Sequence, residues 1–253
     1  MAGTAVLERL TPGPRVVWRT ATVAQVIEES PSARTLVLDV PEWPGHRAGQ
    51  HVDVRLTAED GYQAERSYSI ASAPESSTLQ LTVEVIADGE VSPYLGQEVR
   101  AGDRLEVRGP IGGHFSWTVS DGGPLLLVGG GSGLVPLMSM LRHRASQASE
   151  VEARLLVSAR SQDDLLYRAE LGELDPAAGL AVFQTYTRTA PPGWSGWQRR
   201  VDASMLAEVD PGPGARCFVC GPTPFVEGVT QLLVAAGHEN HRIHAERFGP
   251  TGG

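Results

Sequence analysis

The sequence predicts two domains, a small antiparallel β-barrel followed by an α/β domain with a parallel sheet. In the first half of the chain, short runs of alternating apolar and polar residues are separated by glycine and proline, which is typical of antiparallel strands. In the second half, continuous apolar runs alternate with helical segments, as in a parallel sheet covered by helices. The 253 residues are enough for two such cores. We expect domains at 1–119, with 1–15 as an N-terminal extension, and at 120–253.

The barrel half contains four clear strand patterns with turn signals between them. Strands are expected at 34–40, 52–56, 79–85 and 105–108. Glycine and proline at 41–45, 60–61 and 101–103 separate them, which is the pattern of a small antiparallel barrel. One short helix is expected after Asp88, with Ser92 as its N-cap and Pro93 at its first helical position.

The second half alternates strands with helices. A strand at 125–128 leads through glycines into a helix that ends near Arg144. The elements expected after it are a strand at 153–158, a helix at 163–174, strands at 180–186 and 216–220, a helix at 223–236 and a strand at 242–247.

Composition narrows the functional classes. A formal net charge of −9 argues against nucleic-acid binding. No apolar run approaches the roughly 20 residues that span a bilayer, and the first residues lack the pattern of a signal peptide. We therefore expect a cytoplasmic protein without a membrane span. The two cysteines supply neither a disulfide framework nor the four thiolates of an iron–sulfur cluster.

The segment Arg66-Ser-Tyr-Ser69 offers a cation, an aromatic ring and two hydroxyls within four residues. In an extended strand Arg66 and Tyr68 share one face, and Ser67 and Ser69 share the other. An arginine fork suits a phosphate, and a tyrosine ring suits the face of a flat heterocycle. The segment therefore fits a phosphorylated, flat cofactor. An ordinary buried strand with a solvent-reaching arginine remains the alternative.

A glycine turn follows the first strand of the second half, in Leu125-Leu-Leu-Val-Gly-Gly-Gly-Ser-Gly-Leu-Val-Pro136. Free N–H groups at such a helix start attract a pyrophosphate, and glycine lets a ligand approach the backbone. The run fits neither the Gly-x-Gly-x-x-Gly dinucleotide motif nor a P-loop. A purely structural connection remains the alternative.

Three arginines lie at or after successive strand ends, namely Arg160, Arg188 and Arg200. In open parallel sheets ligands bind beyond the carboxyl ends of the strands. A ribose 2′-phosphate is bound by arginine, whereas a 2′-hydroxyl is bound by an acidic residue. Thr187 adds a hydroxyl beside Arg188. Ordinary surface arginines are the alternative.

The pair Cys217-x-x-Cys220 indicates neither a redox motif nor a metal site, because residues three apart in a strand face opposite sides. His238, His241 and His244 fall in a turn that leads into a strand, so we expect them to be solvated or packed. We predict no metal site.

Taken together, these segments resemble the ferredoxin–NADP reductase superfamily along nearly the whole chain. The matching segments, in the order of that family, are Arg66-Ser-Tyr-Ser69, Gly89-Glu-Val-Ser92, Gly109-Pro-Ile-Gly-Gly-His-Phe115, Val128-Gly-Gly-Gly-Ser-Gly-Leu-Val-Pro136, Cys220-Gly-Pro-Thr-Pro224 and Glu246-Arg-Phe248. The resemblance implies a six-stranded antiparallel barrel that binds flavin, either FAD or FMN, followed by a parallel-sheet domain that binds a pyridine nucleotide.

The resemblance also implies roles for individual residues. The flavin would be held by Arg66 at its pyrophosphate, Ser67, Tyr68 at its ring, Ser69 near N5, the phosphate cradle of Val91 and Ser92, and Phe248 on the other ring face. NADPH would be held by Gly130, Gly131, Ser132, Gly133, Arg160, Thr187, Arg188, Arg200, Cys220, Gly221 and Pro222. The catalytic residues would be Ser69, Cys220 and Glu246.

These expectations lead to a flavin-dependent NADPH:acceptor oxidoreductase. Hydride passes from NADPH to flavin N5, and electrons then leave singly to ferredoxin or another one-electron acceptor protein. Because the sequence stops at Gly253 without a fused iron–sulfur domain, we expect that centre on a separate protein, and the chain itself to be a monomer. A flavin reductase, an electron-transfer subunit of an oxygenase or molybdenum enzyme, and a flavin-bearing regulatory module without turnover are the alternatives.

Overall fold

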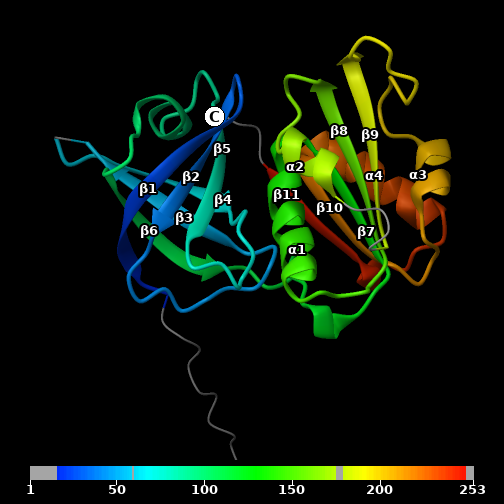
Figure 1. The fold of residues 1–253 in the computed structure, drawn as a ribbon, viewed down its shortest axis with the longest axis horizontal. Coiled ribbons are helices and arrows are strands. Elements are labelled where there is room, and N and C mark those ends of the chain that lie inside the picture. The colour runs from blue at the N-terminus through cyan, green and yellow to red at the C-terminus, as the bar shows by residue number, and fades with distance from the viewer. Residues whose placement is uncertain (1–15, 59, 175–178, 249–253) are drawn as a thin grey trace, which may run out of the picture.

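Two β-sheets lie side by side in the computed structural model, which describes residues 16–58, 60–174 and 179–248 (Figure 1). The N-terminal sheet has six strands and the C-terminal sheet has five. The prediction of an antiparallel barrel followed by a parallel α/β sheet is confirmed.

The barrel sheet follows the order β4-β3-β6-β1-β2-β5. Its strands are β1 (Trp18–Ser30), β2 (Ala33–Asp39), β3 (His51–Thr57), β4 (Gln63–Ser69), β5 (Leu79–Glu84) and β6 (Arg104–Ile111). The two edge strands meet where Ile70 bridges Leu81, and the Ala71 N–H donates to the Gln80 carbonyl at 2.8 Å. The inward-facing apolar residues of all six strands form one buried cluster.

The predicted short helix is present, but its N-cap was wrong. Ser92 and Pro93 lie in a helical turn that continues as a π-helical turn, Tyr94–Glu98. The Ser92 hydroxyl accepts the N–H of Ile86 at 3.1 Å instead of capping the turn. It therefore closes the loop that leads out of β5.

The second sheet is parallel and follows the order β11-β10-β7-β8-β9. Its strands are β7 (Leu125–Gly130), β8 (Ala153–Ser161), β9 (Leu180–Thr189), β10 (Arg216–Pro222) and β11 (Ile243–Phe248). The helices are α1 (Leu134–Ser146), α2 (Arg168–Glu173), α3 (Ala203–Val209) and α4 (Thr223–Ala235). Buried residues of α1 and α2 pack on the sheet face nearer the barrel, and those of α3 and α4 pack on the opposite face (Figure 1).

Two helices differ from the expectation. Helix α2 is shorter than 163–174, because Tyr167 has a left-handed backbone (φ 54°) and the residues before it form turns. Helix α3 was not predicted. Its N-cap is Asp202, whose side chain accepts the Met205 N–H at 2.9 Å.

The two sheets share a packed boundary. Phe115 and Trp117 belong to the same buried cluster as the apolar face of α1. The Arg142 guanidinium donates to the Ala71 carbonyl at 2.8 Å, and the hydroxyls of Thr82 and Tyr167 form a buried hydrogen bond. The boundary is therefore held by apolar contacts together with hydrogen bonds from α1 and Tyr167 to the barrel.

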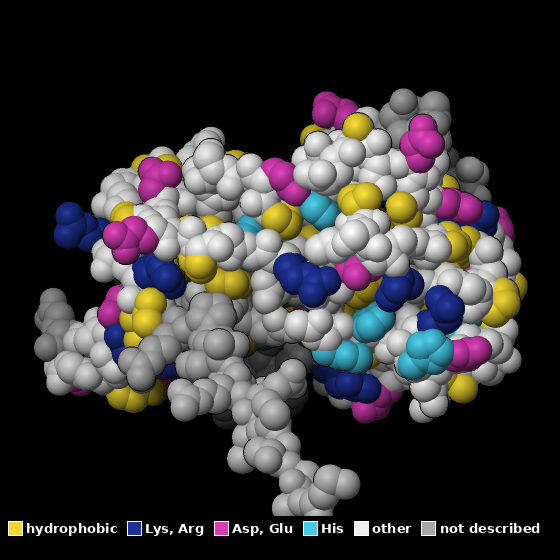
Figure 2. Space-filling model, turned by 90° about the horizontal axis from the view of Figure 1, so that it is seen from below, with side chains coloured by type: hydrophobic (Ala, Val, Ile, Leu, Met, Phe, Trp, Pro, Cys, Tyr) yellow, Lys and Arg dark blue, Asp and Glu magenta, His cyan; other side chains and the backbone are white. Residues whose placement is uncertain are grey.

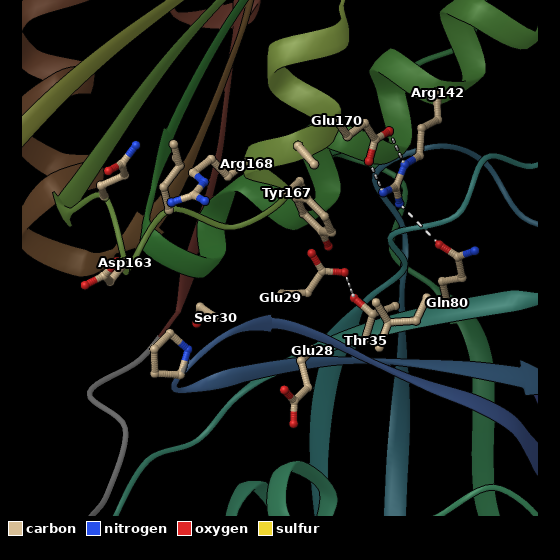
Figure 3. Close-up of a pocket in the computed structure, with 15 residues that line it drawn as sticks. Glu28, Glu29, Ser30, Thr35, Gln80, Arg142, Asp163, Tyr167, Arg168 and Glu170 are labelled. Atoms are coloured by element: carbon tan, nitrogen blue, oxygen red, sulfur yellow. Dashed lines mark hydrogen bonds and ion pairs between the residues drawn. The ribbon is translucent and has the colours of Figure 1, made fainter. Parts of the chain in front are cut away.

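A pocket of about 590 Å³ opens at this boundary, between the β1–β2 hairpin and residues 162–170. Figure 3 shows the Thr35 hydroxyl hydrogen-bonded to Glu29 on the barrel side of the pocket. On the side of the parallel sheet, Arg142 forms an ion pair with Glu170. Cationic, anionic and apolar side chains are interspersed on the face of the molecule in Figure 2. Among the described residues, no helix is both long and apolar enough to cross a membrane.

Candidate functional site

Strand β4 presents the segment Arg66-Ser-Tyr-Ser69 in extended form, so that Arg66 and Tyr68 share one face. In the β3–β4 register Arg66 lies opposite Val54 and Tyr68 opposite Val52, two residues of the barrel core. The Tyr68 ring packs against this core, and burial raises the pKa of its phenol. The Arg66 side chain is half exposed and pairs with Glu90 at 2.7 Å.

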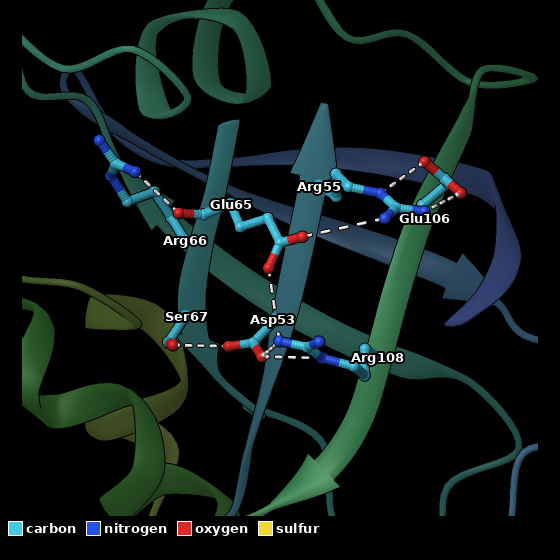
Figure 4. A network of polar contacts seen from close by, with 7 residues as sticks. All are labelled: Asp53, Arg55, Glu65, Arg66, Ser67, Glu106 and Arg108. Carbon is cyan, nitrogen blue, oxygen red and sulfur yellow. Dashed lines mark hydrogen bonds and ion pairs between the residues drawn. The ribbon is translucent and has the colours of Figure 1, made fainter. Parts of the chain in front are cut away.

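Ser67 faces away from this side. Its hydroxyl donates to Asp53 at 2.7 Å, and Arg108 donates to the same carboxylate at 2.7 Å. Figure 4 shows these contacts continuing through Glu65 to Arg55 on the outer face of the barrel. Burial opposes ionisation of Asp53, but the hydrogen bonds from Ser67 and Arg108 outweigh it and lower its pKa. The structure therefore does not bring Ser67 together with Arg66 and Tyr68.

Ser69 lies at the end of β4, where the barrel meets the parallel sheet. It is buried and lies opposite His51 of β3. The His51 Nδ1 atom is 3.7 Å from Oε1 of Glu246 in β11. Glu246 in turn lies opposite Cys220 of β10. The contact between His51 and Glu246 thus links the position of Ser69 in the barrel to that of Cys220 in the parallel sheet.

The ionisable groups at this junction are perturbed by burial. Burial raises the pKa of Glu246 to about 7. Its Oε2 atom is buried and has no hydrogen-bond partner among the described residues. Burial raises the pKa of the Cys220 thiol, and the charge of Glu246 adds to the effect. Burial lowers the pKa of His51, although Asp53 partly compensates. Burial therefore disfavours the charged form of all three groups at this junction.

Sequence analysis missed His51. It is the first residue of β3, and the alternation along that strand places it on the same face as Asp53 and Arg55. The alternation of polar and apolar residues places it opposite Ser69 once β3 and β4 are paired. Its neighbour Glu246 belongs to the last strand, and no sequence pattern links the two.

The glycine turn after β7 packs closely on its neighbours at Gly130 and Gly133 and leaves open space at Gly131. A Cβ atom on Gly133 would lie 2.1 Å from the carbonyl oxygen of Cys220, and one on Gly130 would lie 2.9 Å from the Phe225 ring. These two glycines let the turn pack directly on the end of β10 and on the first turn of α4. Gly131 has a positive φ of 56°, and a Cβ there would approach only Glu84 Oε2, at 4.0 Å, among the described residues. The space above Gly131 is therefore open to a ligand.

The remaining glycine-turn residues agree with this arrangement. Ser132 is partly exposed beside Gly131, and helix α1 begins at Leu134 without a side-chain N-cap. Gly221 has a φ of 152°, and a Cβ there would lie 3.0 Å from the Gly130 carbonyl oxygen. Pro222 is exposed at the end of β10.

The three predicted phosphate arginines differ in their partners. Arg160 pairs with Asp164 at 2.9 Å and with Glu84 at 3.6 Å. Arg188 and Arg200 are exposed and form no ion pair among the described residues. The Thr187 hydroxyl donates to the Ala159 carbonyl at 3.3 Å, which ties the end of β9 to β8.

Three further residues were predicted to contact the flavin, namely Val91, Ser92 and Phe248. Val91 is fully buried in the barrel core and Ser92 is nearly so. Phe248 ends β11 opposite Pro222 and packs, half-buried, on the cluster that contains Cys220. The residues that follow Phe248 lie outside the described part of the chain.

The cysteines and histidines behave as expected. Cys217 and Cys220 belong to clusters on opposite faces of the sheet. His238 is buried between Cys217 and Asp210, His241 is exposed, and the His244 ring stacks on Phe218 with 4.7 Å between ring centroids.

This arrangement fits a flavin on the barrel and a pyridine nucleotide on the sheet. Arg66 and Tyr68 present a cation and a ring on one face, and Gly131 leaves room for a pyrophosphate. The contact of His51 with Glu246 links the position of Ser69 to that of Cys220 at the junction between them. The fold and site define a two-domain flavoprotein oxidoreductase.

Comparisons with known proteins give the same class. Residues 20–117 match the oxidoreductase FAD-binding domain family, and residues 127–231 match the oxidoreductase NAD-binding domain family. The chain therefore belongs to the ferredoxin–NADP reductase superfamily of FAD- and NAD(P)-binding oxidoreductases.

Several relatives are components of oxygenase systems. The chain is 32% identical over 235 residues to a glycine betaine monooxygenase reductase subunit of Pseudomonas aeruginosa, covering 90% of this chain and 63% of that protein. It is 32% identical over 239 residues to the reductase subunit of an Amycolatopsis aromatic O-demethylase, covering 92% and 70%. The chain thus spans less than two thirds of the length of the former relative.

Two solved structures have the same fold. The structure of an Amycolatopsis cytochrome P450 reductase superposes with a TM-score of 0.80 at 30% identity, covering 98% of this chain and 74% of that one. The flavohemoglobin-like FAD/NAD-binding domain of a nitric oxide dioxygenase from Vibrio cholerae superposes with a TM-score of 0.81 at 26% identity, covering 92% and 99%.

Proposed function

We propose that this protein is a flavin-dependent NADPH:acceptor oxidoreductase that delivers electrons singly to a separate protein. The observation that supports this most strongly is the contact between His51 and Glu246, 3.7 Å apart, which joins Ser69 of the barrel to Cys220 of the sheet. A bound flavin supplies hydride acceptance and one-electron release, and the protein supplies orientation and electrostatics.

Each residue of the junction has a task in this proposal. Arg66 binds the flavin pyrophosphate after exchanging Glu90 for it, and Tyr68 supports the ring. Ser69 would hold a hydrogen bond at N5 of the flavin. Cys220 would position the nicotinamide carbon, and Glu246 would accept or return the proton that accompanies electron release. A carboxyl group with a pKa of about 7 suits that task at neutral pH.

The preference for NADPH rests on Arg188 and Arg200. Both are exposed near the carboxyl end of the parallel sheet, where ligands of such sheets bind. Arg160 is less available, because Asp164 and Glu84 already neutralise it. Arg188 is our first choice for the 2′-phosphate, since Thr187 lies beside it.

The acceptor in this proposal is a ferredoxin-like or other one-electron protein. The relatives favour a more specific version, in which the protein is the reductase component of an oxygenase, since glycine betaine monooxygenase and aromatic O-demethylase have reductase subunits of this kind. A stoichiometric complex with an oxygenase or its ferredoxin would support it.

The purified protein provides the test. We expect a flavin absorption spectrum and the release of FAD or FMN, identified by its mass. We also expect NADPH to reduce ferricyanide in the presence of the protein. The kcat/KM for NADPH should exceed that for NADH about 10²-fold or more. A non-catalytic flavin-binding module would show the spectrum without turnover. A preference for NADH would refute the arginine assignment but leave the oxidoreductase assignment intact.

A further inference from the structure

Arg160 is held between carboxylates from both domains. Asp164 pairs with it at 2.9 Å from the turn that follows β8, and the Ser161 hydroxyl holds Asp164 at 2.6 Å. The second carboxylate, Glu84 at 3.6 Å, comes from the end of β5 in the barrel. The arginine is about half exposed and Glu84 is 30% exposed, so this contact between domains is accessible to a competing anion.

Glu84 also lies beside the open side of the glycine turn. Its Oε2 atom would be 4.0 Å from a Cβ on Gly131, and no other described atom outside the immediate chain neighbours comes as close. The other carboxylate oxygen, Oε1, is the one paired with Arg160. A single carboxylate therefore lies between the turn and the arginine, where an incoming phosphate has to fit.

We propose that Glu84 competes with the nucleotide phosphate for Arg160 and for the space above Gly131. The inference rests on the proposed function, because it assumes that a pyridine nucleotide binds at the glycine turn. Two anions at one place repel each other, and one cation cannot satisfy both equally. Nucleotide binding therefore has to separate Glu84 from Arg160, which lowers affinity and opens a contact between the barrel and the sheet.

Substitution of Glu84 by glutamine tests the proposal, since it keeps the shape and removes the charge. The holoprotein is titrated with NADP⁺ and with NAD⁺, and the dissociation constants are measured by isothermal titration calorimetry. We expect NADP⁺ to bind about three- to tenfold more tightly to Glu84→Gln, as the loss of one partly exposed charge interaction implies. The difference should shrink as salt concentration rises.

Three further variants separate the effect from a structural one. Glu84→Asp keeps the charge and should retain weak binding. Glu152→Gln removes a carboxylate that pairs with Arg154 at 2.9 Å in another part of the sheet, so it should bind NADP⁺ like the wild type. In Arg160→Gln the gain from Glu84→Gln should be smaller, because only the repulsion above Gly131 then remains, and the double-mutant cycle reports the coupling between the two residues.

The outcomes also separate this proposal from the proposed function. If the wild type binds nucleotide and Glu84→Gln binds it equally or more weakly, the competition is refuted and the oxidoreductase assignment stands. If Glu84→Gln tightens NADP⁺ binding as much in the Arg160→Gln background as in the wild type, the role of Arg160 is refuted. If the wild type neither binds nor oxidises a pyridine nucleotide, both the function and the competition fail.

Discussion

Replacing Glu246 by glutamine should stabilise the protein at alkaline pH and change little at acidic pH. Burial raises the pKa of this carboxyl from its ordinary 4.5 to about 7, so the folded protein holds its proton where the unfolded chain has lost it. A group of this kind contributes stability that is full below pH 4.5 and is lost as the pH rises through about 7. Glutamine resembles the protonated form and is insensitive to pH.

The size of the effect follows from the shift. One pKa unit corresponds to about 1.4 kcal/mol, so a rise to about 7 corresponds to roughly 3 kcal/mol at pH 8. The Glu246 side chain is 23% exposed, which makes this an upper value. For a chain of this length, 1 kcal/mol shifts Tm by about 2–4 °C. We therefore expect Tm of the variant to exceed the wild type by up to about 10 °C at pH 8 and by about 2 °C at pH 5.

Thermal unfolding followed by near-ultraviolet circular dichroism at pH 5, 6, 7 and 8 measures this difference. Glu239→Gln serves as the control, because that carboxylate is 68% exposed and pairs with the exposed His241. A Tm difference that stays constant across the pH range would show that Glu246 is not a buried, proton-holding group in solution.

Three other predictions concern ligands and rates. Arg66→Ala should weaken flavin binding about 10- to 100-fold by removing a charge-assisted contact, and an unchanged dissociation constant in a flavin fluorescence titration would contradict that role. Ser69→Ala should slow flavin reduction at saturating NADPH in stopped flow more than it weakens NADPH binding; an unaltered rate would leave Ser69 structural. Arg188→Ala should lower kcat/KM for NADPH about 10-fold or more and spare NADH, whereas an equal loss with both nucleotides would indicate a role in the fold or in a shared phosphate site.

The sequence predicts most of the fold, because its strands differ in pattern. In β7, Leu125–Gly130, every residue is buried, as a central parallel strand requires. In β5, Leu79–Glu84, the buried residues Leu79, Leu81 and Val83 alternate with polar residues, which also makes the strand visible. Strand β1, Trp18–Ser30, was not identified individually, since its burial pattern alternates only around Ala21 and Val23. Helix α3 is short and lacks a long apolar stripe, so tertiary packing decides it.

The residues of the candidate site also differ in whether a local sequence pattern can reveal them. The family resemblance pointed to Ser69, Cys220 and Glu246 as catalytic candidates, because each lies in a short segment that matches a family motif. His51 was missed because its importance arises only when β3 and β11 approach each other. A contact between the first and second domains depends on how the sheets pack, and no local pattern of residues encodes it.

The ion-pair partners of the predicted phosphate-binding arginines could not be predicted from the sequence. Arg66 and Arg160 were both assigned to phosphates from sequence, and both are paired with carboxylates of the barrel, Glu90 and Glu84. In each case the carboxylate and the arginine lie in different parts of the chain. A phosphate has to displace such a carboxylate, so affinity depends on the difference between two ion pairs rather than on the presence of an arginine. Arg188 and Arg200, which have no such competitor among the described residues, are therefore the cations on which a 2′-phosphate preference depends most directly.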